Sequence, residues 1–229
     1  MVTQNKKRFL ILQKINMISE LPPVIEFKNK LTNEQVNQLV MEVIEQSFED
    51  DYIAKWGRYP GELISNQRHF DYYNNSVLTS TIGPVLDQIF GKYRVIDTVR
   101  QILYLPWDIH TDWCRDVVDL KPWYNVLIPL ESADSQTFIF EQQANYNDFY
   151  VYKEQNPKLA MPMDIKLFKD RLAHCWEEDQ QWLSILKITS TWNCGDVIAF
   201  QRQHFHSSDY FPSKNIKQKV FLQLLIDRA

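Results

Sequence analysis

The stretch "YRVIDTVRQILYLPWDIHTDW", residues 93–113, decides the fold class of this chain. It is rich in β-branched and aromatic residues, which favour extended strands, and near its end His110 and Asp112 stand two positions apart. Side chains at positions i and i+2 of a strand point to the same face of a sheet. The pattern therefore predicts an imidazole and a carboxylate side by side at the end of a strand.

The segments on either side of this stretch extend the argument. Downstream, short apolar runs separated by polar turn residues predict strands within 123–132, 136–142, 182–192, 195–201 and 217–227. Upstream, 31–50 has helical periodicity after a capping-box pattern at Thr32 and Gln35. The segment 76–93 predicts a second helix, interrupted near Pro84 and ended by Gly91.

Helices come first and many short strands follow, with no β–α alternation. This order predicts a mainly β protein with flanking helices (α+β), and a jelly-roll or cupin-like barrel is the favoured architecture. The 229 residues suit one well-buried core, so we predict a single domain over 1–229. Residues 1–92 would form a helical N-terminal flank, 93–141 and 182–229 the barrel strands, and 142–181 an insertion or lid, helical over 164–178.

The composition excludes several classes of protein. The net charge is −4 and no basic stripe appears, so no nucleic-acid partner is expected. Only five glycines are present and no phosphate-loop pattern occurs. The three cysteines (Cys114, Cys175 and Cys194) are widely spaced, which fits a reducing compartment rather than a disulfide framework or a zinc knuckle. No apolar run approaches the roughly 18 residues of a membrane span. We expect a cytoplasmic protein without a membrane partner.

His110 and Asp112 would need a third ligand to hold a metal ion. The segment "QRQHFHSSDYF", residues 201–211, offers His204 and His206 after a predicted strand. Two histidines and one carboxylate on one side of a metal leave its other positions open, which suits non-haem iron(II) that must bind a co-substrate and oxygen. The pair alone is a weak signal, because a histidine and an aspartate at this spacing also occur by chance in structural roles.

The order of the motifs adds a family resemblance. The strand, the His-x-Asp pair, "YNVLIPLE" at 124–131, "CGDVIAF" at 194–200, a histidine and a basic residue in the final strand follow one another. This order resembles the iron(II)- and 2-oxoglutarate-dependent oxygenases of the double-stranded β-helix fold. The segment "RQHFHSSDYFPSKNIKQKVFLQLLID", residues 202–227, looks like the C-terminal signature of their phytanoyl-CoA and prolyl-hydroxylase-like branches. The resemblance covers roughly 93–141 and 183–227.

The resemblance implies the residues of a metal site. His110, Asp112 and His206 would bind Fe(II), and His204 is the alternative distal ligand. An aspartate at position 112 favours hydroxylation, since halogenating relatives have a small residue there.

The resemblance also implies 2-oxoglutarate as co-substrate together with O2. A lysine of the last strand would hold the distal carboxylate of 2-oxoglutarate: Lys219 is preferred and Lys217 is the alternative. Tyr124, which begins a predicted strand, would also contact the co-substrate. A lysine ammonium deep in a barrel needs a carboxylate partner.

The expected substrate is a small metabolite or an amino acid, free or in a peptide. Arg68, Trp113 and Arg115 are candidate substrate-binding residues, although core or rim packing is the favoured role of Trp113 and an ordinary surface charge that of Arg115. Two other classes remain open: a cupin-type metalloenzyme that does not use 2-oxoglutarate, and a non-catalytic β-barrel binding protein. Neither the oligomeric state nor the particular substrate follows from the sequence.

Overall fold

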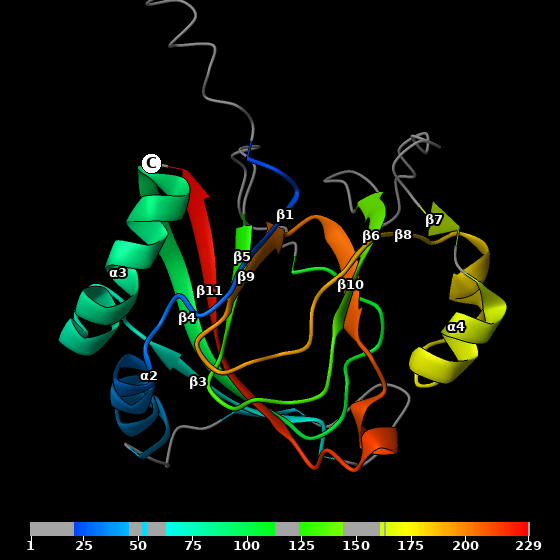
Figure 1. The fold of residues 1–229 in the computed structure, drawn as a ribbon, viewed down its shortest axis with the longest axis horizontal. Helices are drawn as coiled ribbons and strands as arrows, with labels where there is room; N and C mark the ends of the chain where they lie inside the picture. Colours follow the sequence, from blue (N-terminus) through cyan, green and yellow to red (C-terminus); the bar gives the residue numbers. More distant parts are fainter. Residues whose placement is uncertain are drawn as a thin grey trace, which may run out of the picture.

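The computed structural model describes residues 21–45, 52–54, 63–112, 124–143, 161–162 and 164–228. Two antiparallel sheets face one another, and helices cover their outer sides (Figure 1). The sheets do not close into a continuous barrel. This architecture confirms the predicted mainly β fold with flanking helices.

The larger sheet has seven strands and the smaller has four. The order in the larger sheet is β1 (Val24–Phe27), β9 (Val197–Gln201), β5 (Tyr124–Pro129), β11 (Lys219–Arg228), β4 (Tyr93–Leu103), β3 (Ser65–Phe70) and β2 (Tyr52–Ala54). The order in the smaller sheet is β10 (His204–Ser208), β6 (Thr137–Gln143), β8 (Ser184–Ile188) and β7 (Met161–Pro162). The segment after β4 pairs with the smaller sheet through an isolated β-bridge between His110 and His206.

The first helix begins as predicted. Thr32 and Gln35 form the capping box, with each side chain bonded to the other's backbone N–H. Helix α2 runs over Asn33–Val40 and continues as a π-helical turn over Met41–Glu45. The rest of the predicted helix, 46–50, lies outside the described residues.

The predicted interruption of the second helix is wrong. Helix α3 (Ser76–Phe90) continues through Pro84 and ends at Gly91, whose φ of 67° suits glycine. A proline removes the hydrogen bond to the carbonyl four residues earlier, here that of Ser80. Ser80 and Pro84 are both exposed, so water can solvate that carbonyl and the helix continues.

Two predicted segment boundaries look different in the structure. The segment 1–92, predicted as a helical flank, also contributes the strands β1, β2 and β3 to the larger sheet. Strand β3 pairs with β4 along its whole length and so covers an otherwise open edge. Within 142–181, helix α4 (Ile165–Arg171) forms the first half of the helix predicted over 164–178, and a 3-10 turn follows over Glu177–Gln181. Residues 144–160 and 163 lie outside the described part.

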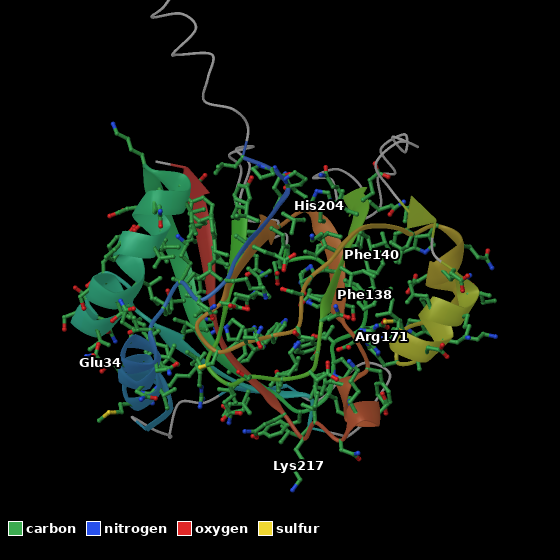
Figure 2. All side chains as sticks on the ribbon, viewed as in Figure 1. Glu34, Phe138, Phe140, Arg171, His204 and Lys217 are labelled. Atoms are coloured by element: carbon green, nitrogen blue, oxygen red, sulfur yellow. The ribbon has the colours of Figure 1, made fainter. Side chains whose placement is uncertain are left out.

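Three apolar clusters hold the layers together. Leu39 of α2, Leu86 of α3 and Leu222 of β11 belong to the cluster between the larger sheet and its helices. Phe138 and Phe140 of β6 project towards α4 in a second cluster (Figure 2). A third cluster fills part of the space between the sheets. Alternate residues of a strand face opposite sides of its sheet. The positions that face the space between the sheets and are not part of the third cluster carry polar side chains. None of the described helices is long and apolar enough to cross a membrane.

Candidate metal centre and its pocket

A pocket of about 320 Å³ lies between the two sheets. Its walls combine histidine, carboxylate and carboxamide groups with aromatic rings, and several predicted site residues are among them. The lining side chains are Gln67, Gln101, Leu103, Trp107, His110, Thr111, Asp112, Asn125, Leu127, Thr137, Trp192, His206, Ser208, Phe221 and Gln223.

The structure brings His110, Asp112 and His206 together at this pocket. One ligand atom of each lies within 4.8 Å of the others. The backbone sets the approach of the two histidines: His110 N donates to His206 O at 3.1 Å, and His206 N donates to His110 O at 2.9 Å. Their ring centroids are 4.4 Å apart. A two-way backbone pair between segments far apart in sequence therefore positions the imidazoles.

Each of these imidazoles has one ring nitrogen engaged by a backbone carbonyl. Nδ1 of His110 is 2.6 Å from Asp108 O, and Nδ1 of His206 is 3.2 Å from His204 O. A nitrogen bonded to a carbonyl carries the proton, so Nε2 keeps the lone pair that a metal needs. Burial lowers the pKa of His206 to about 4, and His110 acts in the same direction. His206 is therefore neutral near pH 7, the form that binds metals.

Two residues that the sequence analysis did not assign to the metal site hold Asp112. The Asn125 amide donates to Asp112 Oδ2, and the Arg202 guanidinium donates to the Asp112 backbone carbonyl. The first bond fixes the carboxylate and the second fixes its backbone, and Asp112 Oδ2 lies 3.3 Å from His206 Nε2. Asn125 is only 1% exposed. A buried polar residue in the apolar run "YNVLIP" was the signal that could have identified it.

The donor set fits iron(II). Two neutral imidazoles and one carboxylate converge from one side, which is the ligand set of non-haem iron(II) sites with open positions. The alternative ligand His204 does not join them. Its Nδ1 is 2.6 Å from Phe140 O and its Nε2 is 2.8 Å from Gln143 Nε2, so both ring nitrogens already have partners. His204 lies on β10, two residues before His206 (Figure 2).

Lys219 lies buried beside the same pocket. Its Nζ donates to Ser208 Oγ at 2.8 Å and sits 3.4 Å from the ring centroid of Trp192, and both of these partners line the pocket. Burial lowers the pKa of Lys219 to about 7, while Asp209 acts in the opposite direction. The expected carboxylate partner is missing: within the described part of the chain, no carboxylate lies at ion-pair distance from Lys219. A ligand carboxylate would supply this missing partner.

The other two residues predicted to bind the co-substrate lie away from the pocket. Lys217 is exposed and its side chain points out of the molecule (Figure 2). Tyr124 is buried in the cluster between the larger sheet and the helices, and its hydroxyl donates to Leu21 O at 2.9 Å. Tyr124 faces away because its neighbour Asn125 occupies the inward position of the same strand.

Of the three candidate substrate residues, the structure describes only Arg68, and Arg68 does not line the pocket. Arg68 follows Gln67, which lines the pocket, so Arg68 projects from the opposite face of β3. Its guanidinium lies 5.4 Å from the ring centroid of Phe70. Trp113 and Arg115 lie outside the described residues, and their assignment stays a prediction.

Comparison with known proteins supports the fold. No family model and no curated protein matches the sequence. Among solved structures, the non-haem α-ketoglutarate-dependent epimerase SnoN from nogalamycin biosynthesis has a TM-score of 0.60 at 9% identity, covering 96% of this chain and 84% of SnoN. The α-ketoglutarate-dependent carbocyclase SnoK has 0.59 at 14%, with 90% and 80% covered. A Pseudomonas putida prolyl-4-hydroxylase has 0.51 at 8%, with 90% and 93% covered. The chain has the double-stranded β-helix fold of the iron- and 2-oxoglutarate-dependent oxygenases.

Proposed function

We propose that the chain is an iron(II)- and 2-oxoglutarate-dependent oxygenase. It would hydroxylate an unactivated C–H bond in a small metabolite or an amino acid, free or in a peptide. One observation carries the proposal: His110, Asp112 and His206 converge on a pocket beside which the buried Lys219 has no carboxylate partner among the described residues. The similarity to 2-oxoglutarate-dependent enzymes of the same fold supports it.

The proposal gives each residue of the site a separate role. His110, Asp112 and His206 would hold iron(II), and Lys219 would pair with the distal carboxylate of 2-oxoglutarate. When bound, iron and 2-oxoglutarate supply the oxidising chemistry, in which O2 is consumed, 2-oxoglutarate becomes succinate and CO2, and one oxygen atom enters the substrate. The Ser208 hydroxyl orients the ammonium of Lys219.

The rest of the pocket supports this chemistry by position and by excluding water. Asn125 holds the carboxylate of Asp112 and Arg202 holds its backbone carbonyl, so the carboxylate has a defined direction. The aromatic side chains of Trp107 and Phe221 line the pocket and reduce its access to water.

Lys219 also separates the proposal from its alternatives. A cupin-type metalloenzyme without 2-oxoglutarate needs the three metal ligands but has no use for an unpaired buried ammonium. A non-catalytic binding protein needs neither. Burying a cation without an anionic partner is unfavourable, so the position of Lys219 beside the pocket is best explained by an anionic ligand.

The test is an anaerobic titration of the protein with iron(II) and then with 2-oxoglutarate. We expect iron to be retained at micromolar concentration and 2-oxoglutarate to produce a weak visible charge-transfer band. Admitting air should then form succinate slowly without added substrate. Iron retention without the band or succinate would indicate the cupin-type alternative. Failure to retain iron would indicate the binding protein.

A further inference from the structure

The pocket also contains a group of carboxamide side chains, of which only Asn125 contacts the proposed metal site, through Asp112. Four carboxamides line it: Gln67 of β3, Gln101 of β4, Gln223 of β11 and Asn125 of β5. We call this group the amide wall. Strands β3, β4, β11 and β5 are consecutive neighbours in the larger sheet, and Gln67 stands directly opposite Gln101. The four carboxamides therefore occupy one face of one sheet.

The hydrogen bonds within the amide wall leave several of its groups unused. The Gln101 amide donates to the Gln223 carbonyl, and both side chains are buried. One such bond consumes one N–H and one carbonyl, so the pair keeps a carbonyl on one residue and an amide N–H2 on the other. Exchanging O and N in both amides gives the same outcome.

The other two carboxamides also have capacity to spare. Within the described ranges, Gln67 has no side-chain hydrogen-bond partner. Asn125 uses its amide N–H2 on Asp112, and its Oδ1 is buried without a partner. A buried acceptor left unpaired is unfavourable, so Asn125 Oδ1 requires a donor that arrives with a ligand.

The charge of the pocket restricts that ligand. Apart from the metal ligands, no charged side chain is among the described residues that line the pocket, and the Lys219 ammonium is assigned to 2-oxoglutarate. A charged substrate group placed against carboxamides would lose its hydration without gaining a counter-ion. The amide wall thus favours an uncharged substrate with many hydrogen-bonding groups.

We infer that the amide wall is the substrate subsite and that it selects an uncharged, hydroxyl-rich molecule such as a glycosyl ring or a cyclic polyol. This inference rests on the proposed oxygenase function. A hydroxyl group both donates and accepts at one atom, so neighbouring hydroxyls can match the mixed donors and acceptors of Gln67, Gln101 and Gln223. A single peptide group offers one donor and one acceptor that point in opposite directions, and satisfies fewer of them.

The first test compares matched probes on the protein loaded with iron(II) and 2-oxoglutarate under anaerobic conditions at pH 6.5. Calorimetry would measure binding of myo-inositol, the methyl glycosides of common hexoses, and their uronate and amino-sugar counterparts, with N-acetylproline amide as a capped peptide. We expect at least one neutral polyol to bind about tenfold more tightly than its charged counterparts, because the described residues that line the pocket offer them no counter-ion. Equal or tighter binding of the charged compounds or of the capped peptide, or no binding by any polyol, overturns the inference.

The second test changes the wall itself. Gln67→Glu keeps the shape of the side chain and breaks no existing side-chain hydrogen bond, so the fold should be retained. We expect the neutral polyol to bind about tenfold more weakly, the amino-sugar counterpart to gain affinity, and the affinity for 2-oxoglutarate to stay unchanged. Gln38→Glu, exposed on α2, is the matched control. If Gln67→Glu weakens 2-oxoglutarate binding instead, the wall belongs to the co-substrate and the inference is wrong.

The two proposals can fail separately. The iron titration and the charge-transfer band contain no substrate and test the oxygenase function alone. If the band forms and the probes do not bind as expected, only the assignment of the amide wall fails.

Discussion

The two sides of the pocket differ in how far their buried polar groups are paired with other groups of the protein. On the metal side, His110, Asp112 and His206 are all hydrogen-bonded to other protein groups. On the lysine side, formed by Lys219, Ser208 and Trp192, the ammonium lies against a hydroxyl and an aromatic ring, and no carboxylate of the described residues is at ion-pair distance.

The protein therefore fixes the geometry of the metal ligands before a metal binds, whereas the charge of the Lys219 ammonium is balanced only when an anion binds. The metal side is preorganised by a backbone bridge, and its His206 imidazole is neutral, so it is stable before a metal binds. The lysine side holds a group whose charged form is unfavourable until an anion arrives. Changes on the metal side should therefore alter metal affinity, and changes on the lysine side should alter co-substrate affinity.

The largest effect is expected for Asp112→Ala. Removing one of three ligand groups should reduce the affinity for iron(II) by more than about a hundredfold, since even residues that only orient a ligand typically contribute 10- to 100-fold. Absorption of cobalt(II) bound in place of iron would measure this without any activity assay. Glu34→Ala is the control, because Glu34 lies on the outer helix α2, away from both sheets (Figure 2). If Asp112→Ala binds the metal with wild-type affinity, Asp112 is not a metal ligand and the assigned metal side is wrong.

The next effect separates the two sides. Lys219→Met keeps the length and packing of the side chain and removes the ammonium. We expect 2-oxoglutarate to bind about 10- to 100-fold more weakly, the size of a lost charge-assisted hydrogen bond, with iron affinity unchanged. Lys217→Met is the matched control because Lys217 is exposed on the same segment. A loss of co-substrate affinity in Lys217→Met rather than in Lys219→Met would reverse the assignment.

Asn125→Ala sharpens the comparison on the metal side. The substitution removes the donor that fixes Asp112 Oδ2. We expect metal affinity to fall by about tenfold and the cobalt(II) spectrum to change shape, because the carboxylate can then rotate. The melting temperature of the metal-free protein tests for a general loss of stability, and Asn37→Ala, exposed on α2, is the control. An unaltered cobalt spectrum would show that Asn125 does not position the ligand.

The sequence predicted those features that local patterns encode. The strands β4, β5, β6, β8, β9 and β11 and the helices α2, α3 and α4 follow from periodicity, capping and turn residues. Strand β3, "SNQRHF", has no clear alternation, and β1 has only four residues, so pairing with β4 and β9 rather than propensity forms them.

The candidate site was predictable where local spacing or the family resemblance marked its residues, although strand β4 ends at Leu103, before the two ligands that were expected at its end. His110 and Asp112 stand two apart, and Lys219 follows from its place in the last strand. The choice of Tyr124 shows the limit, because an error of one position moves a side chain to the other face of a sheet. Its neighbour Asn125 contacts Asp112 through a tertiary register that spacing does not reveal.

The smallest effect concerns pH and tests the lysine side directly. The pKa of Lys219 without ligand is about 7, and its protonated form is the one that pairs with a carboxylate. Bound 2-oxoglutarate should raise that pKa. Affinity is then highest well below pH 7, where Lys219 is already protonated, and falls as the pH rises through 7, because binding must take up a proton. Between pH 7 and 8 the protonated fraction drops from one half to about a tenth, so we expect about a fivefold loss of affinity.

The surroundings of Lys219 do not reverse this direction. Lys214 lowers its pKa and Asp209 raises it. Burial acts to raise the pKa of Asp209, but hydrogen bonds from Ser135, Lys214 and Arg171 hold it below its ordinary value, so Asp209 stays ionised throughout this range. Calorimetric titration of 2-oxoglutarate at several pH values, in buffers of different ionisation enthalpy, measures both affinity and proton uptake. Lys219→Met should show neither the slope nor the uptake. A pH-independent affinity in the unaltered protein would mean that Lys219 is already charged before the ligand binds, and the contrast between the two sides would then be one of position only.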